Sequence, residues 1–151
     1  MNDLQLRPAT AGDAGALTEL VDAAYRHYVE RIGGRPRPMT DDYAEVVRSG
    51  RVTVAQRADQ IVGLIVLDQV DREVVIDNVA VHPEHQGTGV GRALLERAEA
   101  VARDAGLTSI RLYTHERMVE NLALYERIGY VEFERRQHGA AVIVHLRKRL
   151  A

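Results

Sequence analysis

Two hydrophobic periods alternate along this chain, and each change of period marks the boundary of an element. Apolar residues spaced three or four apart predict one face of a helix, whereas alternating or β-branched runs predict strands. The segments with strand character are residues 4–7, 51–56, 61–70, 74–81, 109–114, 130–136 and 141–148. The segments with helical character are residues 11–29, 41–48, 92–105 and 121–128. The predicted order is therefore β-α-α-β-β-β-α-β-α-β-β.

Turn signals indicate how these elements are connected. Residues 51–56 and 61–70 form a predicted hairpin through Ala58 and Asp59, and the turn at residues 71–73 adds the next strand antiparallel. A helix lies between strands 74–81 and 109–114, which implies a parallel pair with a right-handed crossover. We expect a single domain over residues 1–151, because the chain has the length of one sizeable core and no evident linker or repeat.

Composition excludes several classes of function. The chain is 46% hydrophobic and 28% charged with a formal net charge of −2, which gives no electrostatic case for binding nucleic acid. The longest apolar run, residues 61–67, is too short to span a membrane. Charged residues within positions 4–20 argue against a secretory signal, so we expect a cytoplasmic protein. The absence of cysteine excludes disulfides, thiolate nucleophiles and cysteine-ligated zinc.

The segment with the clearest chemistry joins the strand at 74–81 to the helix at 92–105. His82-Pro83 ends the strand, because proline has no N–H for a sheet ladder. Three glycines then follow, Gly87, Gly89 and Gly91. Glycines allow successive backbone N–H groups to point towards one place at the positive end of a helix, where a phosphate or another anion binds.

Spacing separates three kinds of phosphate loop. A nucleoside-triphosphate loop needs a lysine beside its last glycine, and a dinucleotide loop needs GxGxxG rather than the GxGxG found here. The run Gln86-x-x-Gly89-x-Gly91 instead resembles the [RQ]xxGx[GA] pyrophosphate loop of the GNAT superfamily, the acetyl-CoA-dependent N-acyltransferases. A second segment, Asn121-x-x-x-Tyr125 followed by Gly129-Tyr130, is similar to the other recurring segment of that family.

The resemblance covers the whole chain and implies its fold. The implied fold is α/β (α+β), with a mixed, mostly antiparallel and twisted sheet of about seven strands flanked by four helices. It also implies acetyl-CoA as cosubstrate, with backbone groups of the central strand holding the pantetheine and thioester, and with N–H groups of the glycine loop holding the pyrophosphate. The cofactor-binding residues carried over are Val79, Ala80, Val81, Gln86, Gly87, Thr88, Gly89, Val90, Gly91, Arg92 and Asn121.

The resemblance also implies the chemistry. An amine attacks the thioester directly, a strand N–H, that of Val79, stabilises the oxyanion, and Tyr125 matches the residue that gives a proton to the leaving thiolate. From residues alone, Tyr125 equally suits a core aromatic and Asn121 a helix cap.

Many family members deprotonate the incoming ammonium with a glutamate on the central strand, but the matching position here is Val75. Asp77, two residues further on the same strand face, is the nearest carboxylate that could serve as the base. Glu116 and His115 are alternatives, a structural role for Asp77 is another, and water could suffice for an amine of low pKa. We expect no metal, because His82 and His85 have no evident third ligand.

In this superfamily the first two helices and their loop wall the acceptor site. The residues of that segment that could contact an acceptor are Tyr25, Tyr28, Arg31, Arg35, Arg37 and Met39, with Glu116 as a further candidate from outside it. Its arginines favour an acceptor that carries an anionic group, although a solvated basic loop explains them as well.

The sequence thus predicts acetyl transfer to a primary amine of a small molecule, and the expected acceptor is anionic or amino-acid-like. Two alternatives stay open: a protein N-terminal or lysine acetyltransferase, and a non-catalytic acetyl-CoA sensor. We expect no nucleic-acid partner and no membrane contact. A homodimer could form through the apolar edge at residues 142–144.

Overall fold

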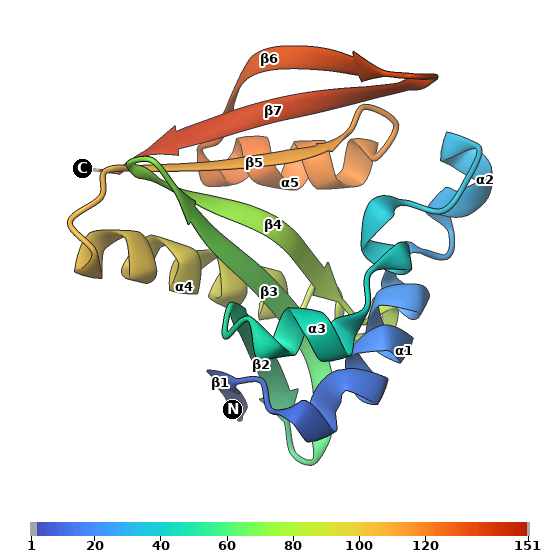
Figure 1. Cartoon of the computed structure of the whole chain (residues 1–151), viewed down its shortest axis with the longest axis vertical. Helices are drawn as coiled ribbons and strands as arrows, with labels where there is room; N and C mark the ends of the chain where they lie inside the picture. Colours follow the sequence, from blue (N-terminus) through green and yellow to red (C-terminus); the bar gives the residue numbers. More distant parts are fainter. Residues whose placement is uncertain (1–2, 151) are drawn as a thin grey trace. The chain divides into compact units, whose positions relative to one another are not determined.

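The structure, a computed structural model, describes residues 3–150 and contains one seven-stranded sheet (Figure 1). The strand order is β1-β2-β3-β4-β5-β7-β6. The strands are β1 (Leu4–Pro8), β2 (Val52–Arg57), β3 (Gln60–Val70), β4 (Glu73–Val81), β5 (Ser109–His115), β6 (Val131–His138) and β7 (Ala141–Arg149). The α-helices are α1 (Ala14–Tyr25), α2 (Tyr28–Ile32), α3 (Tyr43–Arg48), α4 (Val90–Asp104) and α5 (Val119–Ile128). The predicted mixed fold and element order are confirmed.

The helices differ from the prediction by a few residues at several boundaries, and two of these differences change the description of the chain. The first long helix is divided into α1 and α2, because the Val29 N–H bonds to the Arg26 carbonyl, three residues back, at 3.2 Å and tightens the turn there. Helix α5 begins at Val119 with Met118 at its N-cap, so Asn121 lies inside the first turn and is not the cap. The predicted four helices are therefore five.

The chain divides into two compact units, which we describe separately. Unit 1 comprises the residues up to Leu67 together with Asn78–Arg97. In it, β1 pairs antiparallel with β2 and β2 with β3, as the predicted hairpin requires. Ala58 takes a positive φ of 54° at the hairpin turn. The apolar side of α1 is fully buried at Leu17 and Val21, which confirms its predicted face.

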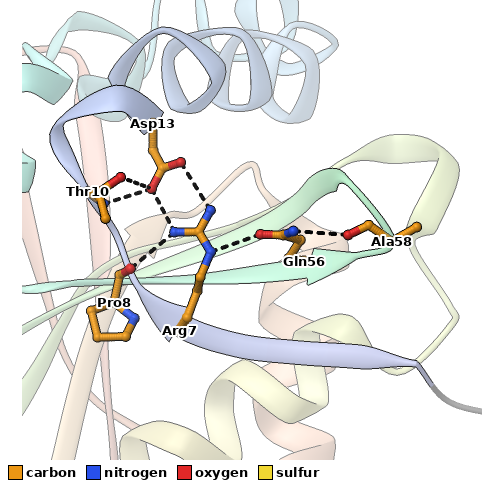
Figure 2. A network of polar contacts seen from close by, with 6 residues as sticks. All are labelled: Arg7, Pro8, Thr10, Asp13, Gln56 and Ala58. Carbon is orange, nitrogen blue, oxygen red and sulfur yellow. Dashed lines mark hydrogen bonds and ion pairs between the residues drawn. The ribbon is translucent and has the colours of Figure 1, made fainter.

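Arg7 of β1 links the start of the chain to β2 in unit 1 (Figure 2). Its guanidinium donates to both carboxylate oxygens of Asp13, at 2.8 and 3.1 Å, and to Gln56 Oε1 at 2.8 Å. The Thr10 N–H donates to the same carboxylate at 2.7 Å, at the spacing predicted for a capping box. The Arg7 guanidinium, which outweighs the opposing effect of burial, lowers the pKa of Asp13 from 3.8 to about 2.

Replacing Asp13 by asparagine should lower the free energy of unfolding at pH 7 by about 2 kcal/mol. The folded protein has the lower Asp13 pKa, so the unfolded chain binds more protons in acid. The stabilisation that the ionised Asp13 carboxylate gives the folded protein is complete above pH 3.8 and is lost as the pH falls towards 2. Denaturant titrations from pH 7 down to pH 2 measure it. Asp59→Asn, at an exposed turn position, is the matched control, and equal losses in both variants would contradict the assignment.

Unit 2 comprises Asp68–Asp77 together with the residues from Ala98 onwards. Strands β4 and β5 are parallel, with Val74 opposite Ile110, which confirms the predicted crossover connection. Strand β5 pairs antiparallel with β7, and β7 with β6, in the long hairpin drawn in red and orange (Figure 1). Ile110 and Leu146 are fully buried on one side of this part of the sheet.

Within residues 3–150, no helix has the length and apolar character needed to cross a membrane.

Candidate active site

The glycine loop of unit 1 has the predicted form, with a strand before it and a helix after it. Strand β4 ends at Val81, and the three-residue 3-10 turn Pro83–His85 precedes the loop. Gly87 and Gly89 have φ values of +77° and +93°, which side-chain-bearing residues rarely adopt. Both glycines are thus required by the backbone path.

The loop leads directly into the N-terminus of α4, a helix of 15 residues. The N–H groups of a first helical turn have no acceptor within their own helix, and the aligned peptide dipoles add partial positive charge there. The first turn here consists of Val90, Gly91 and Arg92. This end of α4 can therefore bind an anionic group such as a diphosphate.

Gly63 of β3 lets the start of α4 approach the sheet closely, a role that the sequence analysis missed. A Cβ atom built there would lie 2.8 Å from Val90 Cγ1, 3.0 Å from Leu94 Cδ1 and 3.2 Å from the Ala80 carbonyl. Only glycine fits without a shift of these neighbours. The available signal was a lone glycine inside a β-branched run, which indicates a close approach of backbone.

Arg57, at the end of β2, braces the glycine loop from the side. Its Nη1 donates to His85 Nδ1 at 3.1 Å and to Thr88 Oγ1 at 3.2 Å. His82 Nδ1 accepts the Glu84 N–H at 3.1 Å, so both histidines have local hydrogen-bond roles. Over the part of the chain that the structure describes, no group of three metal-ligating side chains is found.

A buried polar network in unit 1 joins α1 and α3 to β4. The Tyr25 hydroxyl donates to Asn78 Oδ1 at 2.7 Å and is 3.1 Å from the Val79 carbonyl. Asn78 Nδ2 donates to the Tyr43 hydroxyl at 3.2 Å, and that hydroxyl donates to the Pro38 carbonyl at 2.6 Å. Burial raises the pKa of Tyr43. Asn78, which interrupts an apolar strand, is thus the centre of this network.

The predicted acceptor-wall residues fall into two groups. Tyr25 and Tyr28 are buried, at 7% and 3% exposure. The arginines lie nearer the surface: Arg31 stacks over the Tyr28 ring at 5.0 Å, and Arg35 donates to the Met39 carbonyl at 2.9 Å and lies 3.4 Å from Asp22 Oδ1. The Arg35 side chain keeps 55% of its surface exposed.

In unit 2, the Asp77 carboxylate accepts a hydrogen bond from the Tyr113 hydroxyl at 2.5 Å. The two alternative bases have other partners. Glu116 lies 3.3 Å from Arg135 Nη1. His115 Nδ1 accepts the Arg117 N–H at 3.1 Å, and burial is the main cause that lowers the pKa of His115.

Tyr125 lies on α5, 5% exposed, with its ring edge-on to that of Tyr130 at a centroid distance of 6.1 Å. The Tyr130 hydroxyl is buried and has no hydrogen-bond partner among the described residues. The Asn121 amide lies 3.9 Å from Met118 Sδ. Gly129 ends the helix with a φ of +114°, as its place in the motif predicts.

Comparison with known proteins decides the family. A model of the acetyltransferase (GNAT) family matches residues 16–130, which include the glycine loop and all of α5. The chain belongs to the GNAT acetyltransferase family. Membership confirms the resemblance found in the sequence and makes the chain a member of an acetyltransferase enzyme family.

Relatives of this GNAT chain differ in their acceptors. An IAA acetyltransferase from Azospirillum brasilense is 34% identical over 84 residues, which cover 54% of this chain and 55% of the relative. The L-amino acid N-acyltransferase MnaT of Escherichia coli (strain K12) is 38% identical over 60 residues, 40% of this chain and 35% of the relative. The chain thus spans about half, or less, of these relatives' length.

A solved structure shows the same fold along the whole chain. The PaiA N-acetyltransferase from Thermoplasma acidophilum, in complex with coenzyme A, superposes with a TM-score of 0.84 at 17% identity and covers 99% of both chains. At this identity the likeness concerns the fold.

Proposed function

We propose that this GNAT chain transfers an acetyl group from acetyl-CoA to the primary amine of a small molecule. The observation that carries the proposal is the family match over residues 16–130, which spans a glycine loop with two positive φ values at the positive end of α4. That loop fits a diphosphate, because its backbone N–H groups can bind an anion without any help from side chains.

The chain's own groups would divide the work of binding acetyl-CoA, which supplies a thioester as acyl donor. We assign the N–H groups of residues 87–92 to the diphosphate and the backbone of residues 79–81 to the pantetheine and thioester. The N–H of Val79 is the group proposed for the oxyanion, as the family resemblance implies. Asn121 is a further cofactor contact proposed from the family motif.

Two side chains of unit 2 are proposed for proton transfer. Asp77 would accept a proton from the acceptor ammonium, and Tyr125 would give one to the leaving sulfur. The Tyr113 hydroxyl orients the Asp77 carboxylate, which supports Asp77 as the base, whereas Glu116 is ion-paired with Arg135. The amine then attacks the thioester carbonyl directly.

The acceptor is proposed to carry an anionic group or to resemble an amino acid. Arg35 supports this, because its guanidinium is half exposed and held by Met39 and Asp22 in a glycine-rich loop. The relative MnaT, whose name concerns L-amino acids, supports the same class.

Release of coenzyme A from acetyl-CoA, detected with a thiol reagent, tests the proposal across amino acids, polyamines, aminoglycosides and short peptides. The chain has no cysteine, so the protein gives no background. Turnover with a small amine supports the proposal. Turnover with peptides alone would indicate a protein acceptor, and acetyl-CoA binding without turnover would indicate a sensor. Failure to bind acetyl-CoA would reject the proposed cofactor site.

Arg35→Ala should raise the KM of an anionic acceptor about tenfold and leave the KM of acetyl-CoA unchanged, because one charge-assisted hydrogen bond is lost. Steady-state kinetics with the best amino acid of the panel measure both constants. Arg48→Ala, which removes an exposed arginine of α3, is the control. A panel in which polyamines outperform amino acids would contradict the anionic class.

A further inference from the structure

A row of side chains crosses three neighbouring strands of unit 2 beside the proposed base. The parallel pairing of β4 with β5 ends at Ile76 and Leu112, and the residues that follow on the two strands, Asp77 and Tyr113, are joined by a side-chain hydrogen bond. Tyr113 in turn lies directly opposite His145 of β7. Paired residues on adjacent strands project from the same face, so Asp77, Tyr113 and His145 share one face of the sheet.

The contact between Asp77 and Tyr113 is a charge-assisted hydrogen bond. The Tyr113 hydroxyl donates to Asp77 Oδ1 at 2.5 Å, within the range for a hydroxyl on a carboxylate. This bond orients the carboxylate. A general base needs that property, since it must point at the proton that it accepts.

Another acidic side chain on the same face, Glu73, has a different set of partners. Glu73 accepts from Arg147 Nε at 2.6 Å and from Ser109 Oγ at 2.6 Å, and lies 3.4 Å from Arg111 Nε. Two cations of this face are therefore held by Glu73, whose pKa is lowered chiefly by Arg147. Glu73 is thus bound within this cluster of arginines and Ser109.

His145 supports the ring of Tyr113 from the next strand. The two ring centroids are 5.8 Å apart, and Phe133 lies 6.1 Å from His145 on the other side. His145 Nε2 is buried without a hydrogen-bond partner among the described residues, and burial is the main cause that lowers the pKa of the ring. Burial thus favours the uncharged imidazole, and the ring packs against that of Tyr113.

We propose that Tyr113 is the positioning residue for the Asp77 base. The inference rests on the proposed function and adds to it a residue that the GNAT motifs do not contain. Asp77 takes the first proton from the acceptor ammonium, the C–N bond forms as the C–S bond breaks, and Tyr125 protonates the departing sulfur. The second proton that the nitrogen loses on becoming an amide restores Tyr125 through solvent, and the proton on Asp77 passes to solvent. Tyr113 keeps its own proton throughout.

A double-mutant cycle tests this coupling. Tyr113→Phe removes the hydroxyl and keeps the ring, and should lower kcat about tenfold with the KM of acetyl-CoA unchanged. Asp77→Asn should lower kcat further, and the double variant should equal Asp77→Asn, because Tyr113 acts only through that carboxylate. Multiplicative losses in the double variant would overturn the proposal, as would full activity in Tyr113→Phe.

A pH series separates positioning from general damage to the fold. At high pH the acceptor amine is already deprotonated and needs no base, so the deficit of Tyr113→Phe relative to the unmodified chain should shrink as the pH rises. A deficit that is constant with pH would reject the role. Tyr130→Phe is the matched control with unchanged kcat, because its buried hydroxyl has no partner. Absence of turnover in the unmodified chain would reject the proposed function itself.

Discussion

Tyr125→Phe should lower kcat about a hundredfold while the Kd of acetyl-CoA stays unchanged. Loss of a positioned general acid costs this much in many enzymes, because the departing thiolate must then take its proton from water. The ring of Tyr125 is buried against that of Tyr130, and phenylalanine keeps this contact. The variant therefore removes the proposed proton donor and leaves the ring contact of Tyr125 with Tyr130 in place.

Pre-steady-state and steady-state release of coenzyme A measure the effect, with acetyl-CoA affinity determined by calorimetry. Tyr130→Phe again provides the control, because it removes a hydroxyl from the neighbouring ring and should not alter kcat. If Tyr125→Phe retains full kcat, the helix tyrosine is a core aromatic only, and the acid must be sought elsewhere.

Gly89→Ala should weaken acetyl-CoA binding about tenfold or more, since forcing an L side chain into φ +93° costs about 1–2 kcal/mol or displaces the loop N–H groups. Nothing lies within 4 Å of the added Cβ, so crowding is not the cause. Calorimetry measures the Kd of acetyl-CoA, and denaturant titrations measure the loss of stability that the strained backbone causes.

Gly106→Ala is the matched control for this substitution. Gly106 also has a positive φ, +73°, and open space around it, but it follows the other end of α4. Both variants should lose stability, and only Gly89→Ala should lose cofactor affinity. Equal affinities in the two variants would show that the loop does not bind the diphosphate.

Most of the fold could be predicted from local pattern, because strand and helix periods were clear and each turn carried its own signal. The parallel pairing of β4 with β5 followed from one crossover helix. The division between α1 and α2 could not be predicted, since Arg26 and His27 are not helix breakers. That boundary depends on a local change of hydrogen bonding in an otherwise regular helical pattern.

The parts of the candidate site that depend on local backbone conformation could be predicted from the sequence. The parts that depend on contacts between distant residues could not. The glycine spacing indicated the loop, and the structure shows the positive φ values that require glycine there. Gly63 and Arg57 were missed because their partners are distant along the chain: Val90 and Leu94 for Gly63, and His85 for Arg57. The bond between Tyr113 and Asp77 depends on strand register, which a single sequence does not determine.

The brace from Arg57 to His85 and Thr88 has a consequence for the kinetics of ligand capture. Because these bonds hold the loop from the end of β2, much of its conformational entropy is lost during folding and not during binding. Encounter with a polyanionic ligand should then be limited by diffusion and ionic strength, without a slow ordering step. Strand β2 carries none of the proposed catalytic groups, but through Arg57 it should influence the association rate constant of the proposed acyl donor.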